Sequence, residues 1–306
     1  MAGLRGLHLL LTYQCNFECD HCFVWGGPDQ EGTMTLAQVR DIFAQGRELG
    51  SVRGICFEGG EPFLYYAPLL ESAREARAFG WSVDVLTNAY WATSAEDALL
   101  WLRPLADVGV DSLWVSEDDY HGSSGDGSPP RVAAQAAGEL GISADGISIR
   151  AACDSVPSAV ERKGEPVTGG EVMFRGRAAV KLVEGLPRQP WRQFTCCPHE
   201  ELAEPTRVHI DPMGYVHACQ GLAIGNLWSK PLAEIMRSYQ PAAHPICGPL
   251  IEGGPAALAE AFDAPHEQTY VDACHMCYEV RSRLRCRVPE YLAPDQMYGD
   301  RATSTA

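Results

Sequence analysis

Apolar residues in the first 180 positions form short runs that alternate with longer stretches of helical spacing. A short apolar run predicts a strand, whereas apolar residues three and four positions apart mark one face of a helix. The predicted strands are 6–13, 52–57, 81–87, 111–116, 146–150 and 170–174, and the predicted helices are 35–49, 68–79, 94–102 and 130–140. This alternation predicts a parallel sheet with crossover helices, and therefore an α/β fold.

Capping residues and glycines predict where several of these helices begin and end. Thr35 and Gln38 have the spacing of a capping box, and Gly50 can end the helix that follows them. Gly80 likewise ends the second predicted helix, and Ser94 caps the third.

The pattern changes after residue 184. Residues 185–190 are rich in glycine and proline and predict a linker. Beyond them, two short alternating runs flank the turn-forming stretch 211–214, which predicts a hairpin near residues 208–217. The chain of 306 residues is long enough for one large domain and a smaller one. We therefore expect domains at 1–184 and 185–290, followed by a C-terminal tail at 291–306.

Composition limits the class of protein. Hydrophobic residues make up 46% and charged residues 21%, as in ordinary globular proteins. We find neither an apolar run of membrane-spanning length nor a signal peptide, so we expect a cytoplasmic protein with no membrane partner. The net charge of −16 repels phosphate backbones and argues against nucleic acid as a partner.

Twelve cysteines are many for a cytoplasmic chain, and their clustering favours metal sites over disulfides. Cys15, Cys19 and Cys22 form a Cys-x3-Cys-x2-Cys motif. Three thiolates can hold three irons of a [4Fe–4S] cube and leave the fourth iron open to another ligand.

A second motif, Gly59-Gly60-Glu61-Pro62, follows a predicted strand about 40 residues later. Two glycines let the backbone approach a ligand closely, and proline stiffens the turn. Together the two motifs resemble the radical S-adenosylmethionine (SAM) superfamily. The resemblance implies a partial (β/α)6 TIM-like barrel, a [4Fe–4S] cluster on the three cysteines that binds SAM, and SAM contacts from Gly59, Gly60, Glu61 and Pro62. Gly176-Arg177-Ala178, after the last predicted strand, also resembles that family.

Polar residues gather where the predicted strands end, which is the active edge of such barrels. By position, Ser116 and Asp118 are candidates for SAM contacts. The candidates for proton handling or substrate anchoring are Asp119, Tyr120, His121, Arg150 and Arg175. A loop over 122–130, rich in Gly, Ser and Pro, is expected at the mouth.

A second cysteine set begins with Cys196 and Cys197 and continues with Gly214-x4-Cys219, the run 224–227 and Cys274-x2-Cys277. This arrangement resembles a twitch domain, the short form of the SPASM domain found in many radical SAM enzymes. The resemblance implies an auxiliary [4Fe–4S] cluster on Cys197, Cys219, Cys274 and Cys277, with Cys196 as the alternative first ligand. Four cysteines also suit a structural zinc, which is the competing interpretation. Cys56, Cys153 and Cys247 are expected to be ordinary buried cysteines, and Cys286 has no assignment.

The resemblance implies an enzyme that reductively cleaves SAM and abstracts a hydrogen atom from a substrate C–H bond. A flavodoxin or ferredoxin would supply the electron. The substrate is expected to be a peptide or protein side chain. Alternatives are a small molecule such as an aminosugar, or a non-catalytic iron–sulfur or zinc protein, although the latter has no use for residues 59–62.

Overall fold

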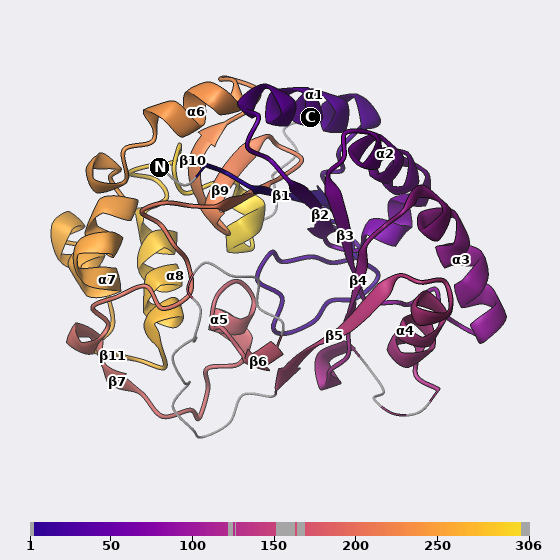
Figure 1. The fold of residues 1–306 in the computed structure, drawn as a ribbon. Coiled ribbons are helices and arrows are strands. Elements are labelled where there is room, and N and C mark those ends of the chain that lie inside the picture. The colour runs from indigo at the N-terminus through magenta and orange to yellow at the C-terminus, as the bar shows by residue number, and fades with distance from the viewer. Residues whose placement is uncertain (1–2, 122–124, 126, 151–162, 164–168, 301–306) are drawn as a thin grey trace.

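The computed structural model describes residues 3–300 except 122–124, 126, 151–162 and 164–168, and is built on one nine-stranded sheet (Figure 1). The strands run in the order β10-β9-β8-β1-β2-β3-β4-β5-β6, and β1 to β6 pair in parallel. These six are β1 (Gly6–Thr12), β2 (Gly54–Gly59), β3 (Ser82–Thr87), β4 (Ser112–Ser116), β5 (Ser143–Arg150) and β6 (Gly169–Glu171). The predicted α/β fold with a partial parallel barrel is confirmed.

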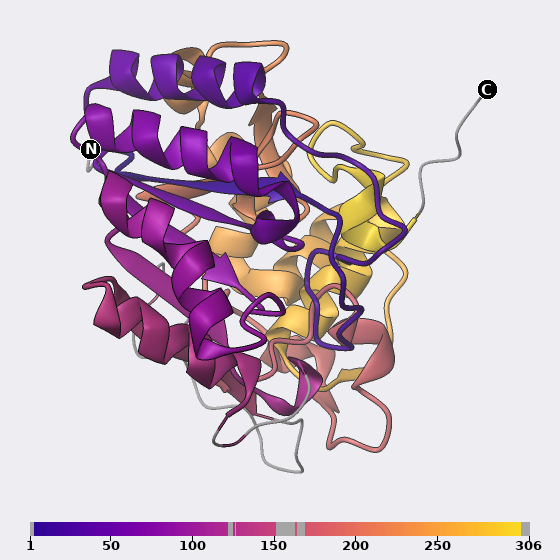
Figure 2. The same cartoon turned by 90° about the vertical axis from the view of Figure 1, so that its right-hand side faces the viewer.

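Crossover helices cover the outer side of these strands (Figures 1 and 2). They are α1 (Leu36–Leu49), α2 (Tyr66–Ala78), α3 (Ala95–Val108) and α4 (Pro129–Glu139). Alternate strand residues such as Leu7, Leu9 and Phe57 are fully buried beneath these helices. The opposite face of the strands is left to line the barrel interior.

The start of α1 agrees with the prediction from the sequence, whereas α3 is longer than predicted. Thr35 and Gln38 form the predicted capping box, and Gly50 adopts the left-handed conformation that ends the helix. Helix α3 continues past Leu102 through Pro104 to Val108. Proline cannot donate to the carbonyl of Leu100, but Leu100 is 66% exposed, so water can take that bond.

The last two parallel strands differ from their predicted limits. Strand β5 begins three residues earlier than expected, where Ser143 pairs with Ser112. Strand β6 covers only Gly169–Glu171 and ends before the predicted limit at residue 174.

The predicted hairpin exists and joins the same sheet. Strands β8 (Arg207–Ile210) and β9 (Tyr215–Cys219) are antiparallel, and β10 (Leu222–Asn226) follows on the outer edge. Strand β8 pairs in parallel with β1, from Gly6 opposite Arg207 to Leu9 opposite Ile210. The sheet therefore crosses the boundary expected at residue 184, because β1 offers a free edge to β8.

Helices complete the structure beside the hairpin: α5 (Ala178–Lys181), α6 (Leu232–Ser238), α7 (Cys247–Phe262) and α8 (Ala273–Leu284). Two short strands, β7 (Gln189–Pro190) and β11 (Thr269–Tyr270), pair separately. Short 3-10 turns are η1 (Pro62–Tyr65), η2 (Asp119–His121), η3 (Trp191–Gln193), η4 (Pro241–Ala243) and η5 (Asp295–Tyr298).

The start of the segment expected as a tail packs against the body. Leu292, Met297 and Tyr298 are buried, and Gln296 donates to the carbonyls of Val24 and Trp25. Residues 301–306 lie outside the described part of the chain.

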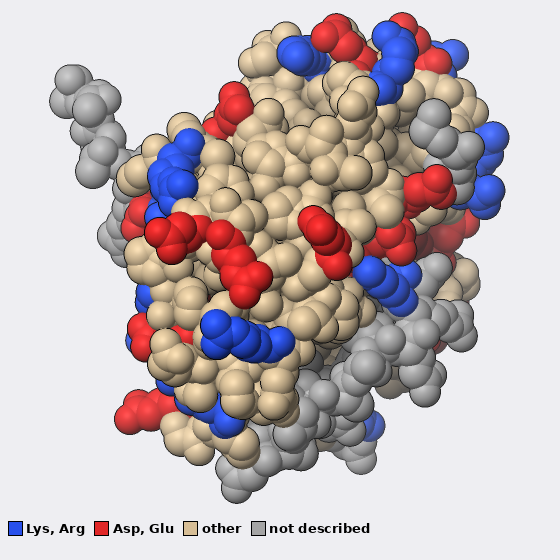
Figure 3. Space-filling model, turned by 90° about the vertical axis from the view of Figure 1, so that its left-hand side faces the viewer, with Lys and Arg blue, Asp and Glu red and all other residues tan. Residues whose placement is uncertain are grey.

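Charged side chains of both signs are scattered over the face shown in Figure 3, with uncharged surface between them. The net negative charge thus forms no single-sign patch on this view. Among the described residues, none of the helices is long and apolar enough to cross a bilayer.

A buried hydrogen bond joins the loop after β1 to the hairpin of β8 and β9. The Tyr13 hydroxyl donates to Asp211 Oδ2 at 2.8 Å, and both residues are fully buried. We expect Tyr13→Phe to lower the free energy of unfolding by about 1–3 kcal/mol, because the fully buried Asp211 carboxylate loses one of its donors. Tyr65→Phe removes a partly exposed bond to Gln14 and serves as the control. Equal losses in urea unfolding of the two variants would contradict this role.

Candidate active site

Three cysteine side chains from one loop meet at a cavity of about 260 Å³. The loop runs from the end of β1 toward α1, and Cys15, Cys19 and Cys22 all line the cavity. Backbone N–H groups point at two of the sulfurs, from Phe17 to Cys15 at 3.4 Å and from Gly26 to Cys22 at 3.2 Å. The loop therefore presents its thiols to one space with donors arranged around them.

The electrostatics of this trio suit a bound cationic centre. Burial raises the pKa of the Cys15 thiol to about 12, and the nearby Glu61 and Cys22 raise it too. Burial, followed by Cys22 and Cys15, raises the pKa of Cys19 still further. Thiolates crowded together away from water repel one another unless iron or another metal compensates them. The donor set thus fits the iron–sulfur cluster that the sequence predicts.

Gly59 and Gly60 form the opposite wall of the cavity, at the end of β2. A Cβ on Gly60 would lie 2.0 Å from the Gln14 carbonyl oxygen, and one on Gly59 would lie 2.4 Å from that of Thr12. Only glycine permits this close approach between the turn and the cysteine loop. The two sequence motifs are therefore packed against each other.

Glu61 and Pro62 hold the turn from behind and do not line the cavity. The Glu61 carboxylate accepts from the backbone N–H groups of Phe63 at 3.0 Å and Asn88 at 2.8 Å, and from the Thr87 hydroxyl at 2.8 Å. Burial raises its pKa to about 7. Glu61 thus joins the end of β2 to the end of β3, a structural role beside the SAM role that the resemblance implies.

Asn88 is a site residue whose function the sequence did not reveal. Its amide donates to Asn16 Oδ1 at 2.9 Å and lies 3.6 Å from Cys15 Sγ. It also lines the cavity, so the end of β3 supports the first cysteine directly.

The segment Gly176-Arg177 clamps the cysteine loop from the far side. Arg177 donates through Nη1 to the Cys19 carbonyl at 2.7 Å and through Nη2 to the Gly26 carbonyl at 2.9 Å. Its backbone N–H donates to the Cys22 carbonyl at 2.9 Å. These bonds explain why a Gly-Arg-Ala sequence follows the last parallel strand.

The end of β4 contributes Ser116, Asp118 and His121 to the cavity wall. Asp118 Oδ1 lies 2.8 Å from His121 Nδ1, and Oδ2 accepts from the Ile149 backbone at 3.2 Å. Although burial raises it, the adjacent His121 holds the pKa of the Asp118 carboxyl below its usual range. The structure brings this predicted group to the cysteine trio.

The other candidates near β4 lie differently. Asp119 is exposed and does not line the cavity. The Tyr120 ring lies 4.5 Å from that of His21, next to the third cysteine. Burial lowers the pKa of His21 to about 4. The side chain of Arg150, Cys153 and residues 122–124 and 126 of the predicted loop 122–130 lie outside the described part of the chain.

The second cysteine set also converges, although its members are far apart in sequence. Cys197, Cys219, Cys274 and Cys277 line one small cavity, with the last two on α8. Burial raises the pKa of Cys197 to about 12, and Cys219 and Cys277 contribute. Cys196 and Cys286 are exposed, and Cys247 is buried. Of the two adjacent cysteines, Cys197 is therefore the one that faces the set.

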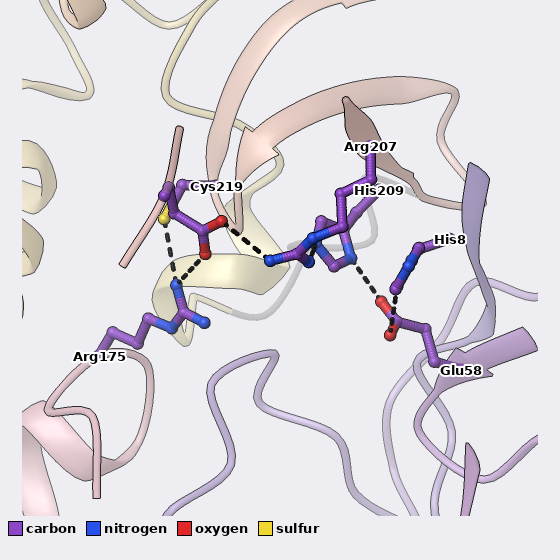
Figure 4. A network of polar contacts seen from close by, with 7 residues as sticks. His8, Glu58, Arg175, Arg207, His209 and Cys219 are labelled. Atoms are coloured by element: carbon purple, nitrogen blue, oxygen red, sulfur yellow. Dashed lines mark hydrogen bonds and ion pairs between the residues drawn. The ribbon is translucent and has the colours of Figure 1, made fainter. Parts of the chain in front are cut away.

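Arg175 lies between the two cysteine sites and lines both cavities. Figure 4 shows its guanidinium directed at Cys219, whose Sγ lies 3.3 Å from Arg175 Nη1. The contact of Arg175 with Glu200 is a buried ion pair of 3.0 Å, and the same guanidinium lies 4.9 Å from the Phe23 ring centre. Arg175 therefore places a positive charge beside the second thiol set.

A row of polar and charged groups leads from Arg175 past Arg207 and His209 to Glu58 and His8 (Figure 4). Glu200 also contacts Arg207 at 3.4 Å, and Arg207 lies 3.4 Å from His209 Nε2. His209 and His8 both contact Glu58, at 2.5 and 3.2 Å. No sequence motif singled out His8, Glu58, Glu200, Arg207 or His209 as site residues. Polar residues at alternate positions of otherwise apolar strands were the available signal.

Gly176 offers a clean test of the clamp, since its φ is +60° and an added Cβ would lie 2.4 Å from Phe23 Cα. We expect Gly176→Ala to shift the Cys22 segment and lower the iron retained after anaerobic reconstitution by about four irons per chain, the content of one cube. Gly185→Ala is the control, because its φ is +76° but its Cβ would meet nothing within 4 Å. Iron contents that match between the two variants would contradict the clamp.

Comparison with known proteins agrees with this geometry. Residues 9–119 match the family model described as the Radical SAM superfamily. That stretch contains the cysteine trio, the glycine turn and the end of β4. Similarity to this family implies a [4Fe–4S] cluster and SAM as the groups that this segment would hold.

Three curated proteins are similar over parts of the chain. A putative peptide biosynthesis protein, YydG, of Bacillus subtilis is 26% identical over 36% of this chain and 35% of its own length. A tungsten-containing aldehyde ferredoxin oxidoreductase cofactor-modifying protein of Pyrococcus furiosus is 29% identical over 38% of this chain and 31% of its own. A PqqA peptide cyclase of Streptomyces rochei is 34% identical, over 39% and 31%. The chain thus matches about a third of the length of each relative, and its residues 9–119 are similar to the Radical SAM superfamily.

Proposed function

We propose that this protein is a radical SAM enzyme that abstracts a hydrogen atom from a C–H bond of a peptide or protein side chain. The proposal depends chiefly on one observation: Cys15, Cys19 and Cys22 share a buried cavity with Gly59 and Gly60. When bound and reduced, a [4Fe–4S] cluster with an open iron supplies the electron that cleaves SAM to methionine and a 5′-deoxyadenosyl radical.

The chain's own residues then serve to position and shield the reacting groups. Apolar side chains form one wall of the cavity: Leu86, Trp114, Ile147, Ile149, Val172 and Met173. Such a wall excludes water, which would otherwise quench a reactive intermediate.

Polar residues at the cavity mouth are assigned as follows. Ser116 and Asp118 are proposed as SAM contacts, together with the backbone of the 59–62 turn. His121 is hydrogen-bonded to Asp118 and lines the cavity, so it is the best placed of the predicted groups for proton handling. Tyr120, Asp119 and Arg150 remain predictions for substrate anchoring.

We further propose that residues 185–290 carry an auxiliary [4Fe–4S] cluster on Cys197, Cys219, Cys274 and Cys277. Convergence of the four thiols on one cavity supports this assignment, as does the positive charge of Arg175 beside Cys219. Hydrogen bonds to cluster sulfurs are a usual means of setting a reduction potential. A flavodoxin- or ferredoxin-type protein is the proposed reductant.

The substrate assignment rests on the relatives. Two of the three named above are described as peptide biosynthesis or peptide cyclase proteins, which favours a peptide. The Pyrococcus furiosus relative is described as cofactor-modifying, which supports a small molecule as the second candidate. A non-catalytic metal protein is disfavoured, because it would have no use for a glycine turn pressed against the cysteine loop.

The central experiment measures SAM cleavage and iron together. The wild-type protein should hold about eight irons per chain after anaerobic reconstitution, four for each cube. With dithionite and SAM it should release 5′-deoxyadenosine. Replacing Cys15, Cys19 and Cys22 by alanine should abolish that product and leave about four irons. A fully loaded wild-type protein that yields no 5′-deoxyadenosine would rule out the proposed function.

A matched pair of variants tests the second site. Cys197→Ser should remove the auxiliary cluster and reduce iron to about four per chain. Cys196→Ser should leave it unchanged, because that side chain is exposed. If Cys196→Ser causes the loss instead, the ligand assignment is wrong. A wild-type protein that holds zinc and only about four irons per chain would instead identify the second cysteine set as a structural zinc site.

A further inference from the structure

One level of the barrel interior is polar across five neighbouring strands. Parallel pairing places His209 of β8 opposite His8 of β1, and His8 opposite Cys56 of β2. Cys56 in turn pairs with Asp84 of β3, and Asp84 with Ser112 of β4. Parallel barrels ordinarily fill such layers with branched apolar side chains. A layer of imidazole, thiol and carboxylate groups therefore calls for a chemical explanation.

Glu58 lies two residues after Cys56 on the same face of β2. One of its carboxylate oxygens is hydrogen-bonded to His209. Arg207 can only donate, so its 3.4 Å contact makes His209 Nε2 an acceptor. His209 Nδ1 consequently carries the hydrogen and donates to Glu58 Oε1 at 2.5 Å. The other oxygen, Oε2, faces His8 Nδ1 at 3.2 Å. Glu58 is thus oriented by His209, with its second oxygen directed toward His8.

The potential ligand atoms of His8, Cys56 and Glu58 all lie within 4.8 Å of one another. Two ligands bound tetrahedrally to one zinc ion at about 2.0 Å lie about 3.3 Å apart, close to the separation of His8 Nδ1 and Glu58 Oε2. We propose that His8, Cys56 and Glu58 form a binding site for a zinc-like divalent cation in the barrel, separate from both cysteine sets. A nitrogen, a sulfur and an oxygen are the three donor types that zinc accepts.

Charge and access both support this site. A Cys56 thiolate and the Glu58 carboxylate together neutralise one dication. The nearest guanidinium, Arg207, is held by Glu200 and directed at His209. His8, Cys56 and Glu58 all line the cavity that the first cysteine trio opens into. Three protein ligands leave a fourth position, which faces the space where a substrate oxygen could bind.

His209 belongs to the site as a positioning residue. It contacts Glu58 directly, and its ring centre lies 4.9 Å from that of His8. Partners that orient a metal ligand in this way usually raise affinity for the metal by about 10- to 100-fold. His8, Glu58 and His209 lie together at the far end of the row from Arg175 in Figure 4.

The test uses the full-length protein with its cysteine sets already loaded with iron. After incubation with zinc and desalting, about one zinc per chain should remain. X-ray absorption at the zinc edge should show one sulfur at about 2.3 Å and two or three nitrogen or oxygen neighbours at about 2.0 Å. Zinc bound in a cysteine set would instead show three or four sulfurs, which would overturn the proposal, as would the absence of retained zinc.

Variants then identify the ligands. Cys56→Ser and Glu58→Gln should lose the zinc while the iron content stays unchanged, and His209→Gln should bind zinc about 10- to 100-fold more weakly. Cys286→Ser is the matched control, because Cys286 is exposed and outside both ligand sets. Retention of zinc by both Cys56→Ser and Glu58→Gln would overturn the assignment. Because the readout is zinc, the result is independent of whether the protein forms 5′-deoxyadenosine.

Discussion

The pairing of β8 with β1 is the constraint on which the rest of the structure depends. Strand β1 lies between β2 and β8, so a segment 200 residues away in sequence becomes its direct neighbour. The pairing is reinforced where Tyr13, just after β1, bonds Asp211, just after β8. Without it the hairpin, and Cys219 at the end of β9, would have no fixed place relative to the first cysteine loop.

This arrangement also brings opposite charges into the interior at close range. Arg175 is buried and meets both Glu200 and Cys219, while Glu200 meets Arg207 as well. Burying a charge is costly unless partners compensate it, and removing one partner of such a pair typically costs about 3–5 kcal/mol. Each charged side chain of this row therefore depends on its neighbours for compensation. Because Arg175 lines both cavities, a change at one cysteine site would affect the other.

Close backbone packing provides the second constraint at the site. The glycine turn after β2, the cysteine loop and Gly176 approach one another at distances that exclude any side chain. Three segments from different parts of the chain are thereby held at fixed spacing around one cavity. Binding residues positioned by such a rigid frame lose little conformational freedom when a ligand arrives.

The sequence by itself determined the local features: the strand–helix alternation, the capping box at Thr35 and the hairpin near residue 211. The spacing of Cys15, Cys19 and Cys22 and of the 59–62 turn was equally readable, because such motifs depend on neighbours in sequence. Only the tertiary structure decided that β8 extends the barrel sheet and that Cys197 rather than Cys196 faces the second set. It also decided that Glu61 is tied to β3 and that His8, Cys56, Glu58 and His209 meet. These contacts join residues from separate strands, and strand pairing over long sequence distances leaves no local periodicity from which to predict it.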